Sequence, residues 1–102
     1  MESLIQNLQR TIRALETLSE KRLPEADQVD ELLDQLFQQK IDLVNVTLSS
    51  SSPVYQQAAQ AVSQAATRVE KAAKEPSRVS EAIPVVFDAI GKLAKLLNHV
   101  TP

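Results

Sequence analysis

The sequence contains no cysteine and no tryptophan, and it has one glycine, one tyrosine and two phenylalanines. The lack of cysteine excludes disulfides, thiolate catalysis and iron–sulfur ligation. A single glycine excludes a glycine-rich phosphate loop. Because sandwiches and barrels need turn glycines and strands rich in aromatic or β-branched residues, this composition also argues against an all-β fold.

Long apolar runs and a large excess of one charge are missing too. No stretch approaches the roughly eighteen apolar residues that a membrane-spanning helix needs, so we expect no such helix. The formal net charge of −2 gives no broad basic surface for nucleic acid. With no cysteine and no recognisable signal peptide, we expect a cytoplasmic protein without cofactors.

The residues that are present repeat with helical spacing. Apolar residues three and four apart predict helices over about 3–22, 24–48, 53–74 and 77–100. The clearest stripe is Val79, Ile83, Val86, Ile90, Leu93, Leu97 and Val100. In the second helix the predicted core stripe is Val29, Leu32, Leu33, Leu36, Phe37, Leu43 and Val44.

Three short connections favour antiparallel neighbours, so we predict a single all-α domain, an antiparallel up-down-up-down four-helix bundle. Ser52 and Ser77 are the expected N-caps of the third and fourth helices. The apolar stripe keeps its phase across Pro84, which favours a bent but continuous fourth helix. A later start near Pro84 is the alternative. Gly91 is expected to allow close approach of another helix.

The third predicted helix has the most unusual surface, because no charged residue occurs from Pro53 to Thr67. Alanines, Ala61 among them, widen its apolar arc, while Gln57, Gln60 and Gln64 occupy its back. This pattern predicts either a contact surface for a second chain or a helix wedged between two neighbours whose glutamines face water.

The second predicted helix carries four acids, Asp27, Asp30, Glu31 and Asp34, with no Lys or Arg before Lys40. They cluster nearly opposite the apolar stripe, which suggests a docking surface for a basic partner. The alternative interpretation is a solvent-exposed face whose acidic residues are favoured partly by the helix dipole. The calcium-hand loop pattern is absent, so no metal site is expected.

Catalytic chemistry has little support. His99 is the only histidine, and it falls near the end of the last predicted helix. No nucleophile–base–orienter set can be composed from one terminal histidine and no cysteine, so we expect no enzyme.

The leading hypothesis is therefore a non-catalytic protein–protein interaction module, self-associating as a homodimer or binding another protein through the candidate residues above. The alternatives are a peripheral lipid-surface protein and a small acidic inhibitor or immunity partner of a larger protein. The polar faces are not rich in Lys and Arg, which counts against the lipid surface.

Overall fold

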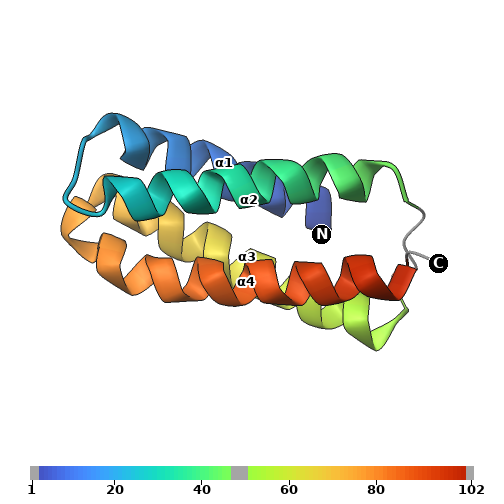
Figure 1. The fold of residues 1–102 in the computed structure, drawn as a ribbon. Coiled ribbons are helices and arrows are strands. Elements are labelled where there is room, and N and C mark those ends of the chain that lie inside the picture. The colour runs from blue at the N-terminus through green and yellow to red at the C-terminus, as the bar shows by residue number, and fades with distance from the viewer. Residues whose placement is uncertain (1–2, 47–50, 101–102) are drawn as a thin grey trace.

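A computed structural model describes residues 3–46 and 51–100 of the chain. It contains four long helices, α1 (Leu4–Glu20), α2 (Ala26–Val44), α3 (Pro53–Lys74) and α4 (Val79–Val100), and a short 3-10 helix, η1 (Pro76–Arg78), before α4. The four helices run in alternating directions along one axis of a molecule measuring 39 × 23 × 18 Å (Figure 1). The prediction of an all-α up-down-up-down bundle is confirmed.

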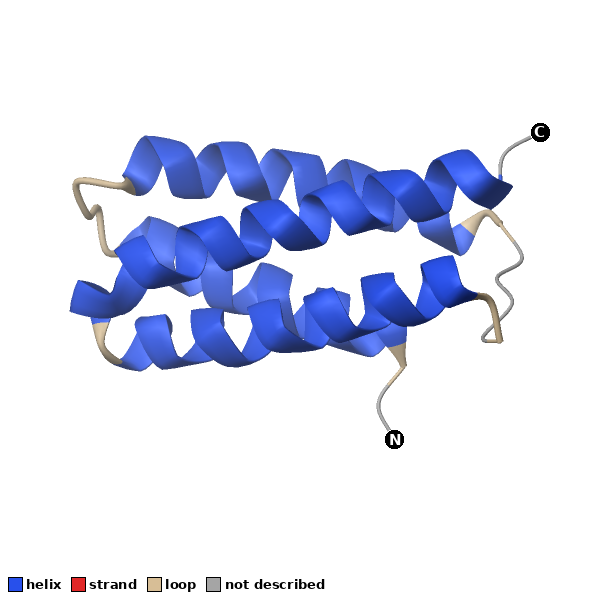
Figure 2. Ribbon diagram, turned by 90° about the horizontal axis from the view of Figure 1, so that it is seen from below, coloured by secondary structure: helices blue, strands red, loops and turns tan. Residues whose placement is uncertain are grey.

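The helices are arranged as two antiparallel hairpins, α1/α2 and α3/α4. Figure 2 shows the same four rods from below, lying along a common direction. α1 packs on α2 and α3, and α4 packs on α3 and α2, so α2 and α3 occupy diagonal corners of the bundle. We expected every connection to join neighbours, and this holds within each hairpin but not between α2 and α3.

One core unites the four helices. The stripes predicted for α1 and α4 face it: Leu4, Leu8, Ile12, Leu15 and Leu18 are buried, as are Val79, Val86, Ile90 and Leu93. α3 contributes Val62 and Val69 together with alanines on both flanks. Because alanine lets helix axes approach closely, α3 sits tightly between α1 and α4.

The helix ends differ in detail from the predictions. α1 begins with a capping box that we had not predicted, in which the Ser3 hydroxyl accepts from the Gln6 backbone N–H and the Gln6 side chain accepts from the Ser3 N–H. Ser52 does precede α3, but its side chain makes no capping hydrogen bond. Ser77 lies within η1 rather than directly before α4.

α2 is shorter than expected at both ends. Pro24 lies in the turn before the helix, which begins at Ala26, and the helix ends at Val44. Of the predicted continuation to residue 48, residues 47 and 48 lie outside the described part of the chain.

The interior of α4 decides two predictions, the continuity of the helix at Pro84 and the packing role of Gly91. It is continuous through Pro84, as the unbroken phase of its stripe predicted. The expectation for Gly91 is wrong: the residue is exposed, and a Cβ built on it meets no atom within 4 Å. Its missing side chain therefore does not serve close helix packing.

Candidate partner-binding surfaces

The four predicted acids form an exposed acidic ridge on the first half of α2, consisting of Asp27, Asp30, Glu31 and Asp34. Asp30 marks the side of the ridge nearest α1, because its carboxylate accepts a hydrogen bond from the Ser19 hydroxyl. No Lys or Arg of residues 3–46 and 51–100 forms an ion pair with any of the four. The ridge is thus negative charge left unneutralised by neighbouring side chains.

Three large apolar side chains lie exposed on the second half of the same helix. Phe37 is 40% exposed, Ile41 56% and Val44 60%. The prediction that Phe37 and Val44 belong to the core stripe is wrong, since they lie about 100° around the helix from the core-facing Leu36 and Leu43. Within residues 3–46 and 51–100, α2 packs mainly on α1 and α4, and Phe37, Ile41 and Val44 on its outer flank stay exposed.

These apolar residues continue the line of the acids. Asp30, Asp34, Phe37, Ile41 and Val44 follow one another at steps of four, three, four and three residues, and they fall within about 80° of arc on a helical wheel. We call these five residues the outer seam of α2. α2 therefore has two seams, one turned to the core and one to water, and the outer one is acidic at its start and apolar at its end.

The glutamine face of α3, formed by Gln57, Gln60 and Gln64, is exposed. Ala61, predicted as part of the same contact surface, is only 6% exposed and belongs to the core. The reason is that α3 is wedged between α1 and α4, so its alanines serve packing within the chain. Of the four candidate residues on α3, the three glutamines are exposed and Ala61 is buried.

The far end of α3 is basic, with Arg68, Lys71 and Lys74 exposed. Arg78 in η1 forms ion pairs with Glu75 and Glu81, which offset its charge, and the hydrogen bond to the Glu75 carboxylate raises the Arg78 pKa. Since α2 and α3 are diagonal, the acidic and basic surfaces lie on opposite sides of the bundle.

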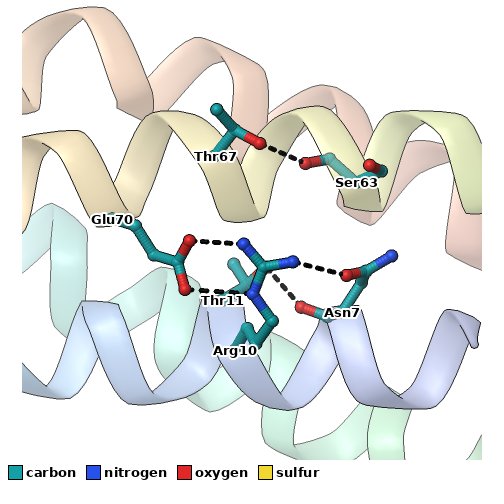
Figure 3. A network of polar contacts seen from close by, with 6 residues as sticks. All are labelled: Asn7, Arg10, Thr11, Ser63, Thr67 and Glu70. Atoms are coloured by element: carbon teal, nitrogen blue, oxygen red, sulfur yellow. Dashed lines mark hydrogen bonds and ion pairs between the residues drawn. The ribbon is translucent and has the colours of Figure 1, made fainter. Parts of the chain in front are cut away.

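A polar network joins α1 to α3 (Figure 3). The Arg10 guanidinium donates to both carboxylate oxygens of Glu70, and its third nitrogen donates to Asn7 Oδ1 at 2.9 Å. The buried Thr11 hydroxyl donates to the Asn7 carbonyl, also at 2.9 Å. The hydrogen bond from Arg10 lowers the Glu70 pKa against a smaller opposing effect of burial. The network links α1 to α3.

A groove of about 580 Å³ lies between the last turns of α2 and α4. Its floor includes Gln39, a buried amide that sequence reasoning missed although it falls three residues after Leu36, in phase with the core. Gln39 Nε2 donates to the Ile90 carbonyl at 2.9 Å, while its Oε1 is buried without a hydrogen-bond partner among the described residues. Asp42, Asn45, Val46, Ala94, Leu97 and Asn98 complete the lining.

We compared the chain with models of protein families, with curated proteins and with solved structures. None matches.

Two features of the described ranges concern other classes of function. Within residues 3–46 and 51–100, no three His, Asp or Glu side chains are grouped so that they could hold a metal ion. No helix of those ranges has the length and apolar character to cross a bilayer. His99 is exposed in the last turn of α4, where its imidazole lies away from the acidic ridge of α2.

Proposed function

We propose that this chain is a non-catalytic helical module that binds another protein through the outer seam of α2. The observation that carries the proposal is the exposure of Phe37, Ile41 and Val44 in one line along a helix. Apolar side chains gathered at helical spacing on a surface are typical of faces that another helix covers. Burying them against a partner removes apolar area from water, which favours association.

A pull-down with matched variants tests this proposal. We expect proteins retained by the wild-type chain to be lost when Phe37, Ile41 and Val44 are all replaced by serine. Phe87→Ser is the matched control, because Phe87 is 63% exposed but lies on α4, away from the seam. Circular dichroism checks that each variant is folded. Equal retention of every protein by the wild type and the triple variant would contradict the proposal.

Self-association as a homodimer through α3 is a second candidate. Its support is the exposed, uncharged glutamine face, whose amides can hydrogen-bond to the same amides of another copy. We expect a dimer in sedimentation velocity that is lost when Gln57, Gln60 and Gln64 are all replaced by glutamate. A strictly monomeric wild-type protein at about 100 μM, a concentration at which micromolar dimers form, would exclude it.

The proposal places the module in the cytoplasm, in agreement with a sequence that has no cysteine. A fluorescent fusion in the native cell tests the location. Enrichment in a membrane or in a secreted fraction would contradict it.

A further inference from the structure

We infer that the outer seam of α2 receives a basic amphipathic helix from a different protein. The apolar residues of that helix pack on Phe37, Ile41 and Val44, and its Lys or Arg residues face Asp30 and Asp34. This inference rests on the proposed function and adds the chemistry, length and orientation of the partner.

The spacing of the seam defines the shape of its partner. Steps of four and three residues are the repeat by which two helices pack along a shared line. From Asp30 to Val44 the seam covers fourteen residue steps, or about 21 Å at 1.5 Å per residue. The matching partner is a helix of about four turns with its own contact residues three and four apart.

The charges define which end of the partner lies where. Asp34 has no ion-pair partner in residues 3–46 and 51–100, and Asp30 bonds only to the neutral Ser19 hydroxyl. α2 itself carries a single cation, Lys40, which is half-buried and lies on the core side of the seam. The cationic residues of the partner therefore belong at the N-terminal end of α2 and its apolar residues at the C-terminal end.

A second copy of this chain does not complement the seam. Parallel pairing of two α2 helices places Asp30 and Asp34 against the same acids of the other copy, where like charges repel. Antiparallel pairing over the full seam places Asp30 against Val44 and Asp34 against Ile41, which removes carboxylates from water without a counter-charge.

α3 of a second copy does not complement the seam either. The exposed band of α3 ends in cations, but glutamines precede them where the seam requires apolar residues. Charge and apolar pattern together thus favour a partner with a different sequence.

A labelled synthetic helix provides the probe. The peptide has about 20 residues, with lysines placed to face Asp30 and Asp34 and leucines placed to face Phe37, Ile41 and Val44. Its binding to the full chain is measured by fluorescence anisotropy in low and in high salt. One control peptide has glutamates instead of the lysines. Another has the same composition with lysines and leucines interleaved, so that neither orientation matches the seam.

We expect the matched peptide to bind at least tenfold more tightly than either control in low salt. Asp30→Asn with Asp34→Asn should weaken binding about tenfold in low salt and little in high salt, because screening already removes the charge effect there. Ile41→Ser should weaken binding at both. Glu31→Gln and Phe87→Ser, an acid beside the seam and an exposed aromatic on α4, should leave binding unchanged.

Three results would overturn the inference: no binding of the matched peptide, equal binding of the interleaved peptide, or a homodimer in sedimentation velocity that Ile41→Ser abolishes. The pull-down separates this failure from failure of the proposed function. If the serine triple variant loses its retained proteins while the peptide fails to bind, the surface is right and the partner chemistry is wrong. If the triple variant loses nothing, the proposed function itself fails.

Discussion

Gly91 lies inside α4 with open space where a side chain would be. A glycine in a helix interior loses more backbone freedom on folding than alanine does. We therefore expect Gly91→Ala to raise the free energy of unfolding by about 0.5–1 kcal/mol, measured by urea denaturation. The reverse change at a nearby exposed position, Ala94→Gly, should lower it by a similar amount. A destabilised Gly91→Ala variant would show that a neighbour does occupy the space.

The buried Gln39 amide donates a hydrogen bond through Nε2, while its Oε1 has no partner among residues 3–46 and 51–100. The Ile90 carbonyl that it contacts also belongs to the regular hydrogen bonding of α4, so removing the amide leaves no group newly unpaired. Replacement by the similarly shaped methionine should keep stability or raise it by up to about 1 kcal/mol. Thermal unfolding measures the change, with the exposed Gln38→Met as control. A loss above about 2 kcal/mol would contradict this account and show that Gln39 Oε1 accepts a hydrogen bond.

α4 contains a proline in its interior and stays helical around it. Pro84 has no N–H to donate to the Ser80 carbonyl, and its ring is exposed rather than packed in the core. Pro84→Ala restores the hydrogen bond, so we expect a gain of at least about 1 kcal/mol in unfolding free energy. Pro53→Ala is the matched control. Pro53 lies in the first turn of α3, where a backbone N–H has no acceptor within the helix, so the missing N–H of proline costs no hydrogen bond. Equal effects at both prolines would contradict this account.

α2 shows which core residues helical periodicity can predict and which it cannot. Val29, Leu32, Leu36 and Leu43 were assigned correctly to the core, but Phe37 and Val44 were not. Its apolar residues span a wide arc, and how much of that arc is buried depends on how many helices lie alongside. Only the assembled bundle shows that α2 has two neighbours, which leave the outer flank to water.

The four-helix architecture itself was accessible from the sequence because each stripe and each break has a local cause. The diagonal placement of α2 and α3 was not, since a connection of several residues can reach either an adjacent or a diagonal helix. The burial of Ala61 could not be predicted for the same reason. The alanine pattern of α3 fits a surface for a second chain as well as an internal contact, and the packing of α3 between α1 and α4 shows that Ala61 makes an internal contact.

The Arg10–Glu70 pair ties the two hairpins together and makes stability depend on pH. Because the Glu70 pKa is lowered in the folded protein, the pair stabilises fully above the unfolded glutamate pKa of about 4.3, and this contribution disappears as the pH falls through the lower folded value. Both side chains are partly exposed. We therefore expect Glu70→Gln to cost only about 0.5–1 kcal/mol at pH 7.

Urea denaturation at pH 7 and again near pH 3 measures this dependence. The difference between wild type and Glu70→Gln should shrink at the lower pH, because the Glu70 carboxylate loses its charge as the pH falls through its lowered pKa. Asp88→Asn, which removes an exposed contact with Lys92 on one helix, should cost less at pH 7. A Glu70→Gln penalty that is independent of pH would mean that packing rather than charge is lost.

α2 has the least extensive contacts with the rest of the bundle, and the α2/α4 contact is the thinner of its two. Backbone amides of this helix should exchange with deuterium sooner than those of α3, since regions with sparse packing open more often. A ligand that covers the outer flank of α2 would stabilise the helix that we expect to open most often. Ligand binding would then be measured as slower deuterium exchange of the α2 backbone amides and as a higher melting temperature of the protein, even before the natural ligand is identified.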